Sequence, residues 1–320
     1  MKPLVILASL TVAFTACGGD DGVTTGAQAN DGDATESMSG DVTDGADSGE
    51  AATEDMGGSG DQAGGEVTWA QPVAVLDLGA DSPTFVPAPN GAQFAVTTGT
   101  IGQPYTLRII ERDGTVSAEF ETQGSVMAWS DAGIATGTLN NTVAVYSPDG
   151  TQLNEFADAC TWGMVASGPY LVGIAGTEQC STNLETGETV KAEVDVPLQG
   201  VFYGSLPGEP VIWLDRLGDS AFGFDPATLA PVEVDARSIV PEEYGELKAL
   251  SLDRSSVVAV APDARDAGVL YQHLMRNGSP VGNVLATNAV ISADGTTALG
   301  NFYPDGDQGA GTQLGIFSLG

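Results

Sequence analysis

Three kinds of residue are scarce in this 320-residue chain. It has one histidine, three cysteines, and ten lysines and arginines against 43 aspartates and glutamates. The formal net charge of −33 argues against a nucleic-acid partner and an anionic membrane surface, because binding to phosphates depends on lysine and arginine. The single histidine, His273, and the lack of a GxSxG sequence argue against a serine hydrolase.

Long apolar runs and helical periodicity are also missing. The N-terminal run at residues 4–14 has only eleven apolar or small residues, and a membrane-spanning helix needs about 20. Because this run follows the basic Met1-Lys2-Pro3 and ends in small residues, it is typical of a signal peptide over residues 1–16. No later stretch of ten or more residues shows a 3.6-residue period, and frequent Gly, Val and Thr favour an all-β domain.

The residues around Cys17 resemble the lipobox of bacterial lipoproteins. The match covers Phe14-Thr15-Ala16-Cys17, with Phe14 in place of the usual Leu. The resemblance implies that Cys17 is lipidated and holds the mature protein at the bacterial cell envelope through this anchor alone. Gly18 rather than an aspartate follows the cysteine, which implies sorting to the outer membrane. An ordinary secretory signal with an unrelated cysteine is the alternative.

Residues 18–66 form an acidic tract. It holds 13 acids, no lysine or arginine and almost no large apolar side chain. Such a segment cannot bury enough apolar surface to offset its ordering entropy, so we expect a disordered, extended linker. The sequence therefore divides into a leader (1–16), a lipidated cysteine with its linker (17–66) and one β domain (67–320).

Cys160 and Cys180 remain once Cys17 is assigned to the lipid. Two cysteines outside the cytoplasm are expected to form a disulfide. They flank residues 163–176, which are predicted to form a hairpin, so the bridge would join the loop before this hairpin to the loop after it. No metal site is expected there, because His273 is distant in sequence and no CxxC motif occurs.

A hairpin pattern recurs along the β domain. Its clearest copy, residues 142–156 (TVAVYSPDGTQLNEF), alternates apolar and polar residues on both sides of the turn Pro148-Asp149-Gly150. Asp tolerates and Gly favours the positive φ that tight turns require. Four more segments repeat the pattern with declining fidelity: residues 108–120, 182–194, 222–234 and 271–283.

A second set of turns precedes these hairpins, at residues 90, 131, 167, 207, 253 and 294. Four short strands repeated at a spacing of about 40 residues are typical of β-propeller blades. We therefore predict a single propeller of six four-stranded blades. Residues 314–319 leave no chain for a fourth strand in the last blade, so residues 73–78 are predicted to supply it and close the ring. Seven blades or a pair of β-sandwiches are the alternatives.

Two strand-turn-strand units resemble the repeats of WD40-like and TolB-type propellers. They are residues 291–299 (ISADGTTAL) and, more degenerately, residues 85–96. The Trp-Asp dipeptide and the Gly-His start of WD40 repeats are missing. The resemblance covers roughly residues 73–320 and implies the fold, which says little about chemistry.

The sequence offers few candidates for chemistry. In residues 303–311, Asp305 and Asp307 with backbone carbonyls are candidate Ca²⁺ ligands, although we favour a solvated loop. His273 is expected to be an ordinary strand residue. Three tryptophans are expected to pack between blades: Trp129, Trp162 and Trp213.

These observations favour a monomeric binding or scaffold module for a protein or an extracellular polymer, with no cofactor. The alternative is a calcium-assisted hydrolase or lyase whose carboxylates line the propeller channel. The two hypotheses differ in whether the acids cluster at the channel mouth or spread over the outer surface. Because the sequence has no recognisable nucleophile, it favours binding and leaves catalysis open. It does not separate binding from a purely structural role.

Overall fold

The computed structural model describes residues 70–79, 83–138, 142–157, 159–160, 162–175, 178–193, 200–215, 220–235, 247–260, 272–284, 286–302 and 313–320. These residues belong to one compact unit, Glu66–Gly320. Residues 1–69 lie outside the described ranges, so the signal peptide, the lipidation of Cys17 and the acidic linker stay predictions. Every regular element in those ranges is a β-strand, and they contain no helix long and apolar enough to cross a membrane.

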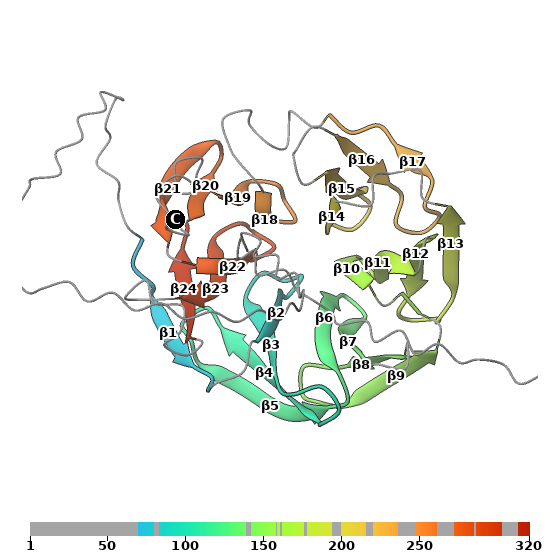
Figure 1. Cartoon of the computed structure of the whole chain (residues 1–320), viewed down its shortest axis with the longest axis horizontal. Helices are drawn as coiled ribbons and strands as arrows, with labels where there is room; N and C mark the ends of the chain where they lie inside the picture. The colour runs from blue at the N-terminus through green and yellow to red at the C-terminus, as the bar shows by residue number, and fades with distance from the viewer. Residues whose placement is uncertain are drawn as a thin grey trace, which may run out of the picture. The chain divides into compact units, whose positions relative to one another are not determined.

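The strands form six antiparallel sheets of four strands each around a common centre, which confirms the predicted six-bladed propeller (Figure 1). Blade 1 contains β2 (Thr84–Pro87), β3 (Gln93–Thr98), β4 (Tyr105–Glu111) and β5 (Val116–Thr122). Blade 2 contains β6 (Ser125–Ser130), β7 (Gly133–Gly137), β8 (Thr142–Tyr146) and β9 (Gln152–Ala157). Blade 3 contains β10 (Trp162–Ser167), β11 (Tyr170–Ala175), β12 (Glu178–Asn183) and β13 (Thr189–Glu193).

The second half of the ring follows the same order. Blade 4 contains β14 (Gly200–Tyr203), β15 (Val211–Asp215), β16 (Ala221–Phe224) and β17 (Pro231–Val232). Blade 5 contains β18 (Leu247–Leu250), β19 (Ser256–Val260), β20 (Gln272–Arg276) and β21 (Ser279–Val284). Blade 6 contains β22 (Ala286–Ile291), β23 (Thr297–Phe302), β24 (Gln313–Ser318) and β1 (Ala74–Asp77).

Blade 6 is completed by a strand from the start of the compact unit. β1 pairs antiparallel with β24, with Ala74 opposite Ile316 and Asp77 opposite Gln313. This is the closure predicted for residues 73–78. It gives all six blades four strands and excludes the seven-bladed and sandwich alternatives.

The hairpin predicted at residues 142–156 is formed by β8 and β9. The Gly150 N–H donates to the carbonyl of Ser147, and Gly150 has a φ of +88°, which glycine adopts without steric cost. A Cβ at Gly150 would lie 2.8 Å from Cγ of Phe120 in blade 1, so glycine also lets this turn pack on its neighbour. The other four predicted hairpins are β4–β5, β12–β13, β16–β17 and β20–β21.

The apolar cores lie between neighbouring blades. Trp129 on β6 is 7% exposed and packs with Ile109 of blade 1. Trp213 on β15 is 1% exposed and packs with Val172 of blade 3. These two tryptophans confirm the predicted packing between blades. Trp162 begins β10, and its side chain lies outside the described part of the chain.

Strand direction gives the propeller two different ends. Because the strands are antiparallel, the turn between the first and second strands and the turn between the third and fourth strands lie at the same end of a blade. We call this end of the propeller the turn face. The last residues of blade 6 reach it, since Leu319 N donates to Thr296 O in the β22–β23 turn (2.8 Å). β1 starts beside the end of β24, so the chain enters and leaves the propeller at the turn face.

Candidate functional site

The innermost strands carry no carboxylate. Figure 1 places β2, β6, β10, β14, β18 and β22 nearest the centre of the ring. Their sequences are TFVP, SVMAWS, WGMVAS, GVFY, LKAL and ATNAVI, and Lys248 is the only charged residue in them. These strands therefore offer no carboxylate pair of the kind that cleaves glycosides. They give the enzymatic alternative no support.

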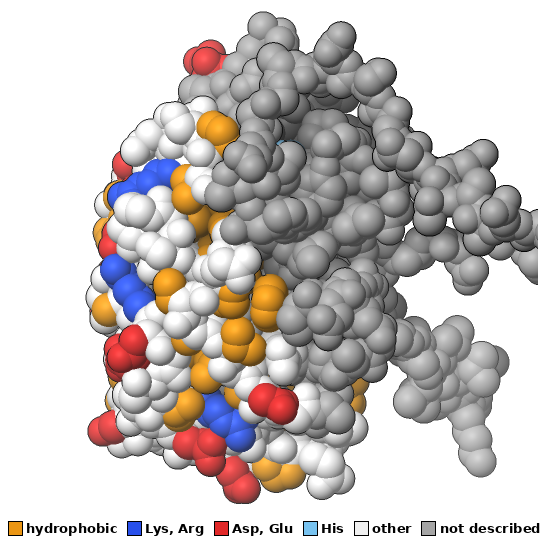
Figure 2. All heavy atoms as spheres, turned by 90° about the vertical axis from the view of Figure 1, so that its left-hand side faces the viewer, with side chains coloured by type: hydrophobic (Ala, Val, Ile, Leu, Met, Phe, Trp, Pro, Cys, Tyr) orange, Lys and Arg blue, Asp and Glu red, His pale blue; other side chains and the backbone are white. Residues whose placement is uncertain are grey.

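Most exposed acids of the described residues lie on the outer strands and in the turns. On the fourth strands they are Asp77, Glu119, Glu121, Glu155 and Glu193. On the turn face they are Asp113, Asp131, Asp149, Glu185, Glu188, Asp253 and Asp294. Figure 2 views the propeller from the side that carries β1 and shows acidic, basic and hydrophobic side chains interspersed there. The acids of the fourth strands are spread over the outer surface, as the binding hypothesis predicts, whereas Asp131, Asp253 and Asp294 follow innermost strands at one end of the propeller.

Two turns of the turn face, in blades 5 and 6, share one pattern of hydrogen bonds. In blade 6 Asp294 Oδ1 accepts from the Ser292 hydroxyl (2.7 Å) and from the amide and hydroxyl of Thr296 (3.2 and 2.9 Å). Thr297 N donates to Ser292 Oγ (3.0 Å). The corresponding hydrogen bonds in blade 5 are made by Ser251, Asp253, Ser255 and Ser256. In both turns the aspartate fixes the backbone through its own side chain.

The hydrogen bonds to Asp294 keep its carboxyl ionised. Burial alone would raise the pKa of Asp294, but donors from Ser292, Arg112 and Thr296 outweigh it and lower the pKa from 3.8 to about 2. A carboxyl with such a pKa cannot serve as a general acid near neutral pH. Asp294 is therefore suited to electrostatic and structural roles.

Two aspartates in the outer hairpins show the same effect. The Ser147 hydroxyl and then the Thr151 amide lower the pKa of Asp149. The Thr115 amide and then the Thr115 hydroxyl lower the pKa of Asp113. Both carboxylates lie in turns of the type predicted from sequence, and both contribute negative charge to the turn face.

Every neighbouring pair of blades is joined by a hydrogen bond. Going round the ring, the first five links are Val126 N to Thr97 Oγ1 (3.0 Å), Asn154 Nδ2 to Leu184 O (3.4 Å), Ser167 Oγ with Ser205 Oγ (2.9 Å), Tyr203 OH to Leu247 O (3.0 Å) and Ser256 Oγ to Gly295 O (2.6 Å). Arg112 closes the ring from blade 1, donating to Asp294 Oδ2 (2.6 Å) and from Nε to Gly91 O (2.7 Å). The links to Leu184, Ser205, Gly295 and Asp294 lie in the turns and make the turn face a preorganised surface, whereas Thr97 and Leu247 lie toward the opposite end of the propeller.

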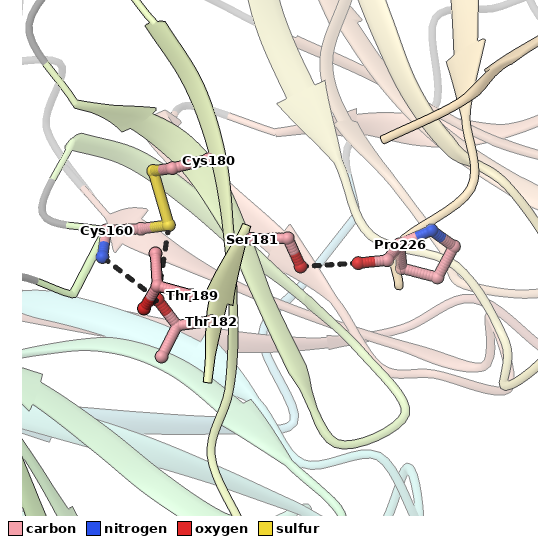
Figure 3. The surroundings of a disulfide bond; sticks show 6 residues. All are labelled: Cys160, Cys180, Ser181, Thr182, Thr189 and Pro226. Atoms are coloured by element: carbon pink, nitrogen blue, oxygen red, sulfur yellow. Dashed lines mark hydrogen bonds between the residues drawn. A yellow bond between two sulfur atoms is a disulfide. The ribbon is translucent and has the colours of Figure 1, made fainter. Parts of the chain in front are cut away.

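The predicted Cys160–Cys180 disulfide is present and buried between blades 2 and 3 (Figure 3). Cys160 precedes β10 as expected, but Cys180 lies within β12 rather than in the loop after the hairpin, because only two residues separate β11 from β12. The Thr182 hydroxyl accepts from Cys160 N (3.2 Å) and donates to Cys160 Sγ (3.4 Å). Ser181 points the other way and donates to Pro226 O in blade 4. Alternate residues of β12 thus connect blade 3 to both neighbours.

The remaining candidates from the sequence are His273 and the pair Asp305 and Asp307. His273 is a half-buried residue of β20, opposite Ala259 and Asn283 in the sheet, as predicted for an ordinary strand position. Asp305 and Asp307 follow β23 and lie outside the described residues, so the calcium site stays a prediction. Within the described ranges, no group of three or more His, Cys, Asp or Glu side chains could hold a metal ion.

Sequence reasoning missed the Arg112–Asp294 pair and the shared pattern of the two turns. The signal for the turns is present: residues 251–256 (SLDRSS) and 292–297 (SADGTT) align position by position, with Ser first, Asp third and a hydroxyl residue fifth and sixth. The ion pair has no comparable signal, because it joins residues 182 positions apart across the seam of the ring.

Solved structures with a similar fold include WD40 proteins. The structure of U3-55K is similar with a TM-score of 0.51 and 11% identity, over 78% of this chain and 99% of that chain. The WD40 repeats of RRP9 are similar with a TM-score of 0.50 and 10% identity, over 79% of this chain and 99% of that chain. At this identity the likeness shows a WD40-like β-propeller fold alone. No protein-family model and no curated protein matches the sequence.

Proposed function

We propose that this chain is a lipoprotein of the bacterial cell envelope, anchored in the outer membrane through Cys17, whose propeller binds or scaffolds a protein or an extracellular polymer. The distribution of acids supports the binding part of the proposal, and the anchor rests on the sequence around Cys17. Exposed carboxylates lie on the turn face and the outer strands, and the innermost strands have none. An enzyme that works through carboxylates lining its channel would need carboxylates on these innermost strands.

The turn face is the surface best suited to binding. Its turns are fixed by their own hydrogen bonds and by links between blades, so the turn face itself loses little conformational entropy when a partner binds. Its exposed carboxylates favour a partner with basic groups, and such attraction raises the rate of association most at low salt. A turn-face ligand is therefore expected to bind more weakly as ionic strength rises.

The proposed tether would join the propeller at this same face, because the chain enters β1 beside the end of β24. A flexible linker of about 50 residues has a root-mean-square span of about 40 Å, and self-repulsion of its acids extends it further. The module would then search a volume next to the membrane while remaining attached to it.

The anchor is tested with the full chain in a bacterial host fed a radiolabelled fatty acid. The unchanged chain is expected to incorporate label and to fractionate with the outer membrane, and Cys17→Ser is expected to lose both properties. Gly18→Asp is the matched variant: it should keep the label and move the protein to the inner membrane. Equal labelling of the unchanged chain and Cys17→Ser would refute the anchor.

Binding is tested with the Cys17→Ser chain and isolated cell envelopes of the same host. We expect saturable, salt-sensitive binding that falls about tenfold, or about 1.4 kcal/mol, when Asp131, Asp149 and Glu185 are changed to lysine. Lysines at Glu155 and Glu193 on the outer strands are the control and should change binding much less. Envelope binding that does not saturate, or that falls equally in both sets, would contradict a turn-face site.

A further inference from the structure

The fourth strand of blade 6 is held differently from the other fourth strands. Each of β5, β9, β13, β17 and β21 follows the third strand of its own blade through a turn. β1 reaches blade 6 from the other end of the compact unit, and its covalent link within the propeller runs to β2 of blade 1. No turn joins β24 to β1, so β1 can separate from β24 without breaking a hairpin.

The pairing of β1 with β24 is short. It covers Gln313–Ile316 and leaves the last two residues of the six-residue β24, Phe317 and Ser318, without a partner in β1. No residue of β1 is buried, whereas four residues of β24 are. The Val73 amide, just before β1, adds one bond to Ile316 O (2.7 Å), so the free part of the edge is at Phe317 and Ser318, where a longer strand could extend the ladder.

The pleat of β1 defines which side chains this edge accepts. Ala74, Leu76 and Leu78 point toward blade 1 and pack against the apolar core between blades 6 and 1. Val75 and Asp77 are exposed, with Val75 at 44%. The inward positions thus repeat every second residue, as a strand with one buried side requires.

The first inward position is restricted to a small side chain. A Cβ built on Gly114, in the β4–β5 turn of blade 1, would lie 2.6 Å from Cβ of Ala74. The turn therefore lies directly against Ala74. The pattern that fits the edge of β24 is a small residue followed by leucines two and four positions later.

The seam between blades 6 and 1 has contacts that do not involve β1. Arg112 pairs with Asp294 across the seam. Phe94 and Val96 of blade 1 share a buried core with Leu299 of blade 6. The ring therefore keeps these contacts when β1 leaves.

The geometry points to the outer edge of β24 as a strand-accepting site whose resident occupant is β1. Its ligand is an extended protein segment of six or more residues with the small-x-Leu-x-Leu pattern, which adds antiparallel to β24 in place of β1. Because β1 is part of the same chain, it competes at an effective concentration of order millimolar, so the site is closed until a longer strand displaces it. This inference goes beyond the proposed function, since it requires neither the lipid anchor nor a ligand on the turn face.

The probe is a fluorescent synthetic peptide of residues 71–79 (QPVAVLDLG), added to the full chain carrying Leu76→Asp. A charge at this half-buried position, which faces the apolar core between blades 6 and 1, should release β1 and open the site. We expect this variant to bind the peptide at least about tenfold more tightly than the unchanged chain, in which β1 competes. Val75→Asp, one residue away on the exposed side of β1, is the matched control and should bind no better than the unchanged chain. A peptide that itself carries Leu76→Asp should not bind.

Leu76→Ala provides a milder variant should Leu76→Asp fail to fold. Its melting temperature is expected to rise by about 3 °C or more in millimolar wild-type peptide, because a ligand that binds only the folded state stabilises it. The unchanged chain should show a much smaller rise. Equal peptide binding by the unchanged chain and Leu76→Asp, or no peptide effect on folded Leu76→Ala, would overturn the proposal.

Discussion

Arg112 and Asp294 form an ion pair, with Nη2 2.6 Å from Oδ2, although 182 positions separate them in sequence. Arg112 follows β4 in blade 1, and Asp294 lies in the β22–β23 turn of blade 6. The same guanidinium donates to the Gly91 carbonyl in the β2–β3 turn. The pair therefore locks the two ends of the ring together at the turn face, separately from the β1–β24 ladder.

Asp294→Asn is expected to destabilise the protein by about 1 kcal/mol or less at pH 7, because 45% of the Asp294 side chain is exposed and solvent screens the pair. The pKa of Asp294 is lowered from 3.8 to about 2 on folding, so its contribution is complete well above pH 3.8 and is lost as the pH falls toward 2. The gap in melting temperature between the unchanged chain and the variant should thus be constant from pH 7 to about pH 5 and shrink below pH 4. A gap that widens on acidification would contradict this assignment.

The Arg112 contribution is separated by a double-mutant cycle with Arg112→Met. The coupling energy with Asp294→Asn is expected to be about 0.5–1 kcal/mol and to fall in high salt. The single Arg112→Met variant should cost more than the coupling, because it also removes the bond to the Gly91 carbonyl. Urea unfolding of the unchanged chain, the two single variants and the double variant gives the free energies from which the coupling energy is calculated.

Gly150→Ala is expected to cost about 2 kcal/mol or more. Alanine at a φ of +88° costs about 1 kcal/mol, and its Cβ would meet Phe120 at 2.8 Å, which adds the cost of overpacking. Gly208→Ala is the matched control, because Gly208 has a φ of +85° and no atom lies within 4 Å of its ideal Cβ. Equal losses of stability in the two variants would show that contact with Phe120 is unimportant.

Leu229 occupies a positive φ of 59° in the β16–β17 turn and is only 4% exposed. Its side chain packs in the core between blades 3 and 4. Both Leu229→Ala and Leu229→Gly lose this packing, at a cost of about 2–4 kcal/mol. Glycine also relieves the backbone, so Leu229→Gly should be more stable than Leu229→Ala by about 1 kcal/mol. Thermal unfolding decides the order, and a more stable alanine variant would refute the backbone argument.

Replacing both Cys160 and Cys180 with alanine is expected to cost about 3 kcal/mol from the bridge, in the chain-entropy account of a loop of this length. A reductant should lower the melting temperature of the unchanged chain and leave that of the double variant unaltered. Cys17→Ala is the control and should keep the full response to the reductant. An unchanged melting temperature on reduction would show that the bridge contributes nothing to stability.

The ring architecture was predictable from sequence because short strands and tight turns recur at a nearly constant spacing along the domain. The turn at Pro148-Asp149-Gly150 contains a glycine at a positive φ, and the turns that precede the hairpins recur about every 40 residues, at 90, 131, 167, 207, 253 and 294. Closure by β1 followed from counting strands in the last unit. The disulfide followed from having two cysteines near one hairpin, although the strand position of Cys180 did not.

The contacts across the seam were not predictable in the same way. Whether Arg112 reaches Asp294 depends on the tilt and spacing of blades 1 and 6, and no local periodicity records it. Nor did hairpin patterning indicate that β17 would be only Pro231–Val232, because alternation continues to Val234 in the sequence. The location of the acids on turns and outer strands likewise required the strand order within each blade.

The antiparallel register of β1 with β24 places Ala74 beside Ile316, so the chain enters and leaves the propeller domain at neighbouring points. If the protein were attached to a surface through either chain terminus, the turn face would lie toward that surface and the opposite end of the propeller would face solution. A donor and an acceptor fluorophore attached just before Ala74 and just after Ser318 would lie close together in the closed ring. Loss of energy transfer between them would then report the departure of β1 in real time, without a partner having to be known.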